Sequence, residues 1–108
     1  MSLVHIVLVR PRDGAEPQAR ALLGELADLA ARLGAREVHA GPNVSTEPFG
    51  GGFTAGAAFG FPDERARDAY LQDPRHLDLA RELAAAAETA LVADLPGRPA
   101  GPDDLGAT

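Results

Sequence analysis

The sequence contains no cysteine and no lysine, and it has only one tyrosine and three histidines among 108 residues. Without cysteine, a disulfide framework, thiolate catalysis and a cysteine-based zinc site are excluded. No apolar run approaches the roughly 20 residues that span a bilayer. The N-terminus has neither a basic region before its apolar run nor a small-residue cleavage site after it. We therefore predict no signal peptide and a cytoplasmic protein.

Positive charge is also scarce. The chain has 10 basic and 16 acidic residues, so its net charge is -6. Nucleic acids and anionic membranes both require a basic patch, so we expect neither as a partner. Every basic residue is arginine and alanine is abundant, which together indicate a GC-rich bacterial genome. The length suits one domain, and the composition, 45% hydrophobic and 24% charged, is typical of a globular chain.

The first predicted element is a buried strand at Leu3–Arg10, which is apolar at almost every position. Side chains alternate along a strand. One face carries Val4, Ile6 and Leu8, and the other carries His5, Val7 and Val9. A helix is predicted over Glu16–Leu33 from apolar residues at three- and four-residue steps, with Pro17 in the first turn and Gly34 after the last.

Two further strands follow the first helix. Residues Arg36–Asn43 predict a half-exposed strand, and a loop with three adjacent glycines comes after it. Residues Phe53–Phe61 alternate strongly. One face carries Phe53, Ala55, Ala57, Phe59 and Phe61, and the other carries Thr54, Gly56, Ala58 and Gly60. The second face has almost no side-chain volume, so another part of the assembly should approach it closely.

The last third of the chain predicts two helices and a strand. One helix runs from Pro62 or Asp63 to Leu71, and another begins at Pro74 with Asp73 as its N-cap. The apolar stripe of this last helix is predicted to be Leu77, Ala80, Leu83, Ala84 and Ala87. A short strand is expected at Ala90–Leu95, and the Pro/Gly/Asp-rich residues 96–108 form a predicted disordered tail beyond a domain of residues 1–95.

The order β-α-β-β-α-α-β predicts an α+β, ferredoxin-like sandwich. Helices can cover only one face of its sheet. The first and third strands are nevertheless apolar, or nearly without side chains, on both faces. An uncovered apolar face is an interaction surface, so we predict a homodimer that packs sheet against sheet.

The stretch YLQDPRH contains the candidate chemical groups, Tyr70 and His76. With Asp73 as the N-cap, His76 occupies the third position of a helix, near free backbone N–H groups that disfavour an imidazolium. A neutral imidazole can act as a general base. The bend at Asp73 can turn the phenol of Tyr70 toward His76. If His5 faces the helices, it joins the same cavity.

Structural interpretations remain open for each of these residues. His76 can serve the helix terminus alone, Tyr70 can be a core residue, and His5 can be a hydrogen-bonded core or interface histidine. His39 lies among polar neighbours and is expected to face solvent. A three-histidine metal site has no supporting HxxxH or HxxE spacing, so we predict neither a metal nor an organic cofactor.

Several stretches together resemble the stress-responsive A/B barrel domain (Dabb) family over about residues 2–95. They are VHIVLVR, GPNVS, FTAGAAFGF and AYLQDPRHLDLARE. The resemblance implies a ferredoxin-like fold and a dimeric α/β barrel. It does not imply one function. In olivetolic acid cyclase-type members, a tyrosine and a histidine catalyse aldol-type closure of a polyketide thioester without a cofactor, and these correspond to Tyr70 and His76. The first-strand histidine corresponds to His5.

One difference from the cyclase concerns the third strand, where Ala55 stands in place of a histidine. The pocket, which we expect Val7, Phe53, Ala55 and Phe59 to line, therefore differs from that of the cyclase. The sequence leads to three hypotheses. The chain is a cofactor-independent, polyketide cyclase-like lyase, or a non-catalytic small-molecule-binding or stress-associated dimer, or a cofactor-free monooxygenase of the same superfamily.

Overall fold

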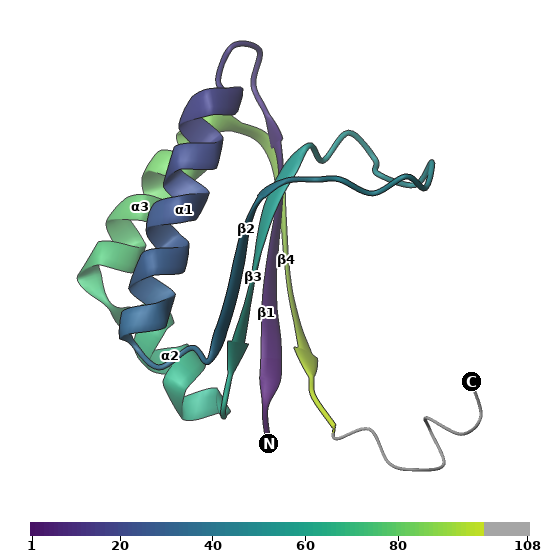
Figure 1. Cartoon of the computed structure of the whole chain (residues 1–108). Coiled ribbons are helices and arrows are strands. Elements are labelled where there is room, and N and C mark those ends of the chain that lie inside the picture. The colour runs from purple at the N-terminus through teal and green to yellow at the C-terminus, as the bar shows by residue number, and fades with distance from the viewer. Residues whose placement is uncertain (99–108) are drawn as a thin grey trace, which may run out of the picture.

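The computed structural model describes residues 1–98, and these form one antiparallel sheet with three helices on one of its faces (Figure 1). The elements are β1 (Leu3–Pro11), α1 (Glu16–Arg32), β2 (Glu37–Pro42), β3 (Ala55–Phe61), α2 (Glu64–Gln72), α3 (Pro74–Ala86) and β4 (Ala87–Pro96). The strand order is β2-β3-β1-β4. The predicted order of elements and the ferredoxin-like α+β fold are confirmed.

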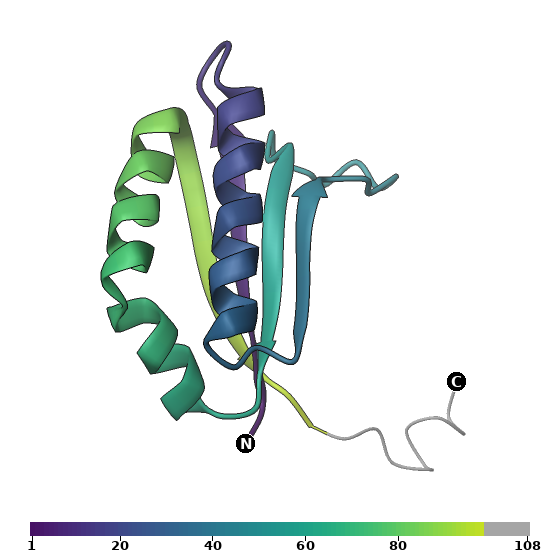
Figure 2. The ribbon, with the colours of Figure 1, turned by 60° about the vertical axis from the view of Figure 1, so that its left-hand side comes forward.

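The helices form a single layer, so within residues 1–98 no element covers the other face of the sheet (Figures 1 and 2). We call this uncovered side the open face. Its central strand β1 presents Val4, Ile6 and Leu8, which pair across the ladder with Leu95, Ala93 and Leu91 of β4. On the other side of β1, the same residues pair with Gly60, Ala58 and Gly56 of β3. The open face is therefore apolar at its centre and poor in side-chain volume over β3.

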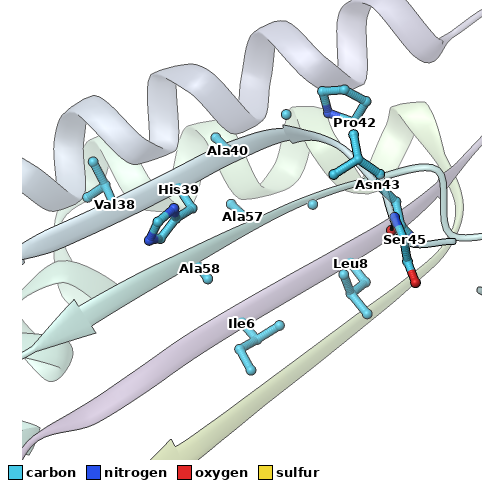
Figure 3. Close-up of a pocket in the computed structure, with 13 residues that line it drawn as sticks. Ile6, Leu8, Val38, His39, Ala40, Pro42, Asn43, Ser45, Ala57 and Ala58 are labelled. Atoms are coloured by element: carbon cyan, nitrogen blue, oxygen red, sulfur yellow. Dashed lines mark hydrogen bonds between the residues drawn. The ribbon is translucent and has the colours of Figure 1, made fainter. Parts of the chain in front are cut away.

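Residues 43–54, which connect β2 to β3, project from the sheet on the side away from the helices (Figure 1). We call this segment the β2–β3 arm. A hollow of about 660 Å³ lies where the arm leaves the open face. Six of the residues that line it are Ile6, Leu8, His39, Val44, Ser45 and Ala58, and Figure 3 shows most of them.

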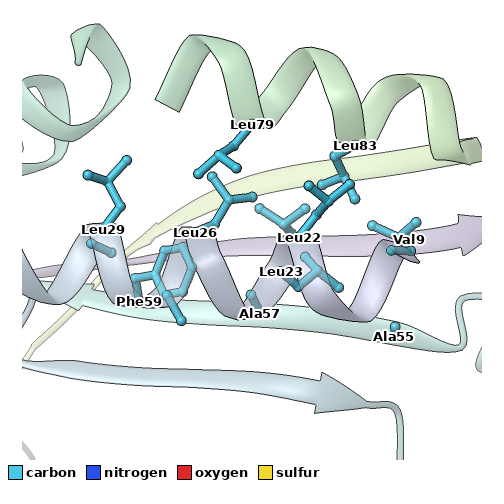
Figure 4. Close-up of a cluster of buried hydrophobic side chains, with 14 of the residues drawn as sticks. Val9, Leu22, Leu23, Leu26, Leu29, Ala55, Ala57, Phe59, Leu79 and Leu83 are labelled. Atoms are coloured by element: carbon cyan, nitrogen blue, oxygen red, sulfur yellow. The ribbon is translucent and has the colours of Figure 1, made fainter. Parts of the chain in front are cut away.

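The hydrophobic core lies between the sheet and the helices. His5, Val7 and Val9 share one face of β1, as the alternation predicts, and this face, together with Leu3, is the one buried under the helices. Leucines of α1 and α3 pack over this layer, and Phe59 of β3 lies in the sheet beneath them (Figure 4). His5 is thus a polar side chain within an apolar layer, and it is only 3% exposed.

Helix α1 ends where the sequence places a glycine. Leu33 is the C-cap, and Gly34 follows with φ of +110°. The next amide, that of Ala35, donates to the carbonyl of Ala30 at 2.9 Å, which closes a Schellman motif. Gly34 therefore occupies the predicted position, and its conformation is one that other residues avoid.

Replacing Gly34 by alanine is expected to destabilise the protein by about 1–2 kcal/mol, because a Cβ is strained at this backbone conformation. Urea unfolding measures the loss. Gly24, in the middle of α1 with open space around its missing Cβ, is the matched control. Gly24→Ala should instead raise stability by about 0.5–1 kcal/mol, because alanine favours a helix. Equal effects at both positions would contradict the role of Gly34.

The chain turns sharply at Asp73, which ends α2 and caps α3. Its carboxylate accepts a hydrogen bond from the amide of Arg75 at 2.8 Å, as expected for an N-cap. The predicted apolar stripe of α3 is only partly right. Leu83 and Ala87 are buried as predicted, but Leu79 and Ala86 are buried as well, whereas Leu77 is 51% exposed. The buried stripe is rotated by about one residue, which brings His76, one turn before Leu79, toward the core.

The last two strands differ in length from the predictions. β3 begins at Ala55 and not at Phe53, because Phe53 and Thr54 belong to the base of the arm. β4 begins at Ala87 and ends at Pro96, so it is longer than predicted at both ends. The amide of Gly97 also donates to the carbonyl of Ser2 at 2.7 Å. The remainder of the predicted tail, residues 99–108, lies outside the described residues.

Candidate functional site

His5, Tyr70 and His76, the three candidate residues from the sequence, lie together beneath the helices. β1 supplies His5, the last turn of α2 supplies Tyr70, and the first turn of α3 supplies His76. The ring centroids of Tyr70 and His76 are 4.6 Å apart, and those of Tyr70 and His5 are 5.8 Å apart. We call these three residues the His–Tyr–His cluster.

Tyr70 stands at the centre of the cluster and is completely buried. Its ring also contacts Phe59 and Phe61 of β3, with centroid distances of 5.7 and 5.6 Å. Three of its ring neighbours thus belong to the sheet and one to α3. The bend at Asp73 turns His76 back over Tyr70, and this bend is why two residues six positions apart in the sequence touch.

Two polar atoms of the cluster are buried without a hydrogen-bond partner among the described residues, the hydroxyl of Tyr70 and Nδ1 of His76. Buried polar groups are nearly always paired, and an unpaired one costs about 1–3 kcal/mol. Two such atoms on touching rings form a polar spot in an otherwise apolar layer. A ligand carrying an oxygen atom is the kind of group that would satisfy both.

Burial sets the protonation state of both groups. Desolvation raises the pKa of the Tyr70 phenol, so this residue remains a neutral hydrogen-bond donor. Desolvation also lowers the pKa of His76 below 6.5, although the Leu71 backbone and Asp73 oppose the shift. His76 is therefore neutral at pH 7. The sequence predicts this direction from the helix terminus, whereas the main cause in the structure is burial.

His5 has a partner that the sequence does not reveal, Asp94 of β4. The Nδ1 atom of His5 lies 2.6 Å from Oδ1 of Asp94, and the two residues are directly paired in the β1–β4 ladder. Arg67 of α2 donates to the other carboxylate oxygen of Asp94 at 3.0 Å. The carboxylate thus fixes the orientation of the His5 ring. The one available signal is a lone acidic residue in the apolar strand ALVADL.

The other predicted pocket residues are distributed along the sheet. Phe59 lies against the His–Tyr–His cluster, and Val7 is the buried residue that follows His5 on the same face of β1. Ala55 pairs with Val9, toward the opposite end of the strand. Phe53 lies at the base of the arm, where the guanidinium carbon of Arg10 is 5.8 Å from its ring centroid. Of these four, Phe59 is the one whose ring contacts the rings of His5 and Tyr70.

His39 is separate from the cluster. Its ring lies on the open face, lines the hollow beside the arm and hydrogen-bonds Glu37 at 2.7 Å (Figure 3). A smaller hollow of about 230 Å³ lies nearer the cluster, and its walls include Leu3, Arg67 and Asp94. This smaller hollow reaches the carboxylate that holds His5.

Replacing Tyr70 by phenylalanine is expected to leave the unfolding free energy unchanged or to raise it by about 1 kcal/mol, because it removes an unpaired buried hydroxyl and keeps the ring. Chemical denaturation measures the change. Tyr70→Leu is the comparison variant, since it loses the ring contacts as well and should destabilise. A loss above about 1 kcal/mol for Tyr70→Phe would mean that the hydroxyl has a structural partner.

The stress responsive A/B barrel domain matches residues 3–96 of this sequence, and the chain belongs to that family. The helix-covered sheet, the open face and the turn that carries His76 all lie within the matched residues. No curated protein matches the sequence. None of the helices in residues 1–98 has the length and apolar character needed to cross a bilayer.

Solved structures of the same fold include proteins with and without a known activity. A dimeric ferredoxin-like protein of unknown function from Jannaschia sp. CCS1 is 30% identical over 90% of this chain and all of its own, with a TM-score of 0.81. Hydroxynitrile lyase from Passiflora edulis is 22% identical, covering 94% of this chain and 97% of its own, with a TM-score of 0.75. SnoaB, a cofactor-independent oxygenase from Streptomyces nogalater, is 18% identical with the same coverage and a TM-score of 0.74.

Proposed function

We propose that this protein is a general acid/base enzyme that acts on an enolisable small molecule, of the kind that undergoes aldol-type cyclisation. One observation carries the proposal. A neutral imidazole and a neutral phenol lie with their rings 4.6 Å apart, and each has a buried polar atom without a partner in the described chain. That pair matches the needs of proton abstraction next to a carbonyl group.

In this mechanism the imidazole of His76 removes a proton from the carbon beside the carbonyl. The electron pair of the broken C–H bond moves into the enolate, and the Tyr70 hydroxyl donates a hydrogen bond to the oxygen that becomes negative. The enolate carbon then attacks a second carbonyl of the same molecule, and the proton held by the imidazole is available for the new alkoxide. General base catalysis of this type contributes about 10²–10⁴-fold.

His5 has a positioning role in the proposal. The contact between its Nδ1 atom and Asp94 holds the ring edge-on against Tyr70, at 67° between ring planes. The bond between Arg67 and Asp94 keeps the carboxylate in place. The apolar walls around the cluster would exclude water from the enolate and strengthen each hydrogen bond to it.

We also propose that two copies pack through their open faces. The support is an apolar sheet face that no helix covers within residues 1–98, together with the dimeric state of the Jannaschia protein. The cluster lies on the opposite face of the sheet, so each copy would have its own site.

A second candidate is a non-catalytic dimer, either binding a small molecule or associated with stress. The complete burial of Tyr70 against Phe59 and Phe61 favours a non-catalytic role, because a tightly packed phenol leaves little room for a reacting molecule. A cofactor-free oxygenase is a third candidate, supported by the fold shared with SnoaB.

Deuterium exchange separates the first two candidates without knowledge of the final product. The protein is mixed with a panel of β-ketoacyl thioesters in D₂O, and loss of the α-proton signal is followed by NMR. We expect exchange above the buffer rate with wild type and a slower rate with Tyr70→Phe. Binding detected by ligand NMR together with exchange at the buffer rate would reject catalysis and favour the binding function.

A further inference from the structure

The β2–β3 arm is the largest feature of the described chain that the proposed chemistry does not use. It leaves the sheet on the side of the open face and extends away from the body of the subunit (Figures 1 and 2). The arm carries exposed apolar side chains. Phe49 is 85% exposed and Val44 is 82% exposed. An exposed aromatic side chain on a projecting segment is typical of an interface anchor.

The base of the arm is fixed by the rest of the fold. The amide of Asn43 donates to the carbonyl of Thr54 at 2.7 Å, and its side-chain amide donates to the carbonyl of Phe53 at 3.0 Å. The Thr54 hydroxyl donates to Glu16 of α1 at 2.7 Å, and the Arg10 guanidinium lies over the ring of Phe53. The direction of the arm is thus set before any partner binds, which reduces the entropy lost on association.

The arm and the open face meet at an angle, and the hollow of about 660 Å³ lies in that corner. The sheet surface is recessed in this corner because Gly56 and Ala58 supply little or no side chain. Ile6 and Leu8 of β1 and Val44 of the arm make its walls apolar (Figure 3). A second subunit laid on the open face would enter this corner and come within reach of the arm.

We propose that the β2–β3 arm packs against a second copy of this chain, with Phe49 buried on the partner subunit. Three observations support a copy of the same chain as the occupant. The arm is continuous with the open face, the open face is apolar, and the Jannaschia protein of the same fold is dimeric. The inference rests on the proposed dimer, and it adds a segment and an anchor outside the sheet.

The absence of tryptophan makes a direct test possible. Phe49→Trp places a single indole on the arm, and Leu77→Trp places one on α3, on the helix side of the subunit. We expect the emission of the Phe49→Trp variant to be shifted to the blue in the dimer and to move to the red on dilution. The emission of the Leu77→Trp variant should stay that of an exposed indole at every concentration.

Two further substitutions separate the arm from the dimer itself. Ala58→Arg puts a charge in the middle of the open face and should give a folded monomer. Combined with Phe49→Trp, it should leave the indole at position 49 exposed. Phe49→Ser should raise the dimer dissociation constant about tenfold or more in analytical ultracentrifugation, whereas Leu77→Ser should not change it.

Each outcome decides one of the claims. If Ala58→Arg is monomeric but the indole of Phe49→Trp is exposed throughout and Phe49→Ser dimerises normally, the open-face dimer stands and the role of the arm is rejected. A dimer that survives Ala58→Arg would reject the open-face interface and the arm contact with it. A wild-type chain that is monomeric at all concentrations would reject both.

Discussion

His76→Gln is expected to lower the rate of enzyme-catalysed α-proton exchange by about 10²–10⁴-fold, the usual contribution of a general base. Glutamine keeps the size and hydrogen-bonding ability of the side chain but cannot take a proton at neutral pH. His39→Gln is the matched control, because His39 lies on the other face of the sheet and is exposed. It should retain the wild-type rate. Equal rates for wild type and His76→Gln would remove His76 from the mechanism.

The pH dependence of the reaction rate and of stability is a second test of the role of His76. The pKa of His76 in the folded protein is lowered below 6.5 by burial. The base form therefore predominates at pH 7, and kcat/KM should fall as the pH drops through this lowered pKa. The unfolding free energy should also fall as the pH drops. Below about pH 6.5 the unfolded chain binds a proton that folded His76 does not, so the unfolding free energy decreases on acidification. His76→Gln should remove this part of the slope.

Phe59→Ala is expected to cost about 3–5 kcal/mol of stability, the range for removing a buried phenylalanine ring. Phe59 is completely buried, and its ring contacts both His5 and Tyr70. Since a domain of this size has about 5–15 kcal/mol of total stability, a large part of it would be lost. Thermal and urea unfolding measure the effect.

Leu77→Ala is the control for Phe59→Ala, because Leu77 is 51% exposed on α3 and its truncation should cost little. Phe59→Leu should fall between the two, since it keeps most of the apolar volume. If Phe59→Ala costs less than about 1 kcal/mol, the layer around the cluster is loosely packed. That result would itself favour space for a ligand beside Tyr70.

The order of elements could be predicted from the sequence because the helices have clear ends. Alternation along β1 puts His5 on the face of Val7 and Val9, but only the structure identifies this face as the one that the helices cover. The Asp73–Pro74 pair likewise fixes the start of α3 and the helical position of His76. Each of these features depends on residues that are close together in the sequence, which is why the sequence alone can predict it.

What the sequence does not predict has physical causes of two kinds. The buried stripe of α3 is ambiguous because alanines on several sides of the helix fit either phase, and Leu77 then favours the wrong one. Asp94 escapes sequence reasoning because its partner His5 lies 89 residues away, and only the strand register brings them together. The contact between Tyr70 and His76 depends on the bend at Asp73, which residue types alone do not specify.

The pairing of His5 with Asp94 links β1 to β4, the first and last strands of the described residues, and this has a consequence for biosynthesis. The ribosome releases the N-terminal residues first, so β1, α1 and β3 can associate while β4 is still being made. The ring of His5 then has no carboxylate to hold it. The proposed acid/base machinery is therefore completed only when β4 pairs with β1 at the edge of the sheet.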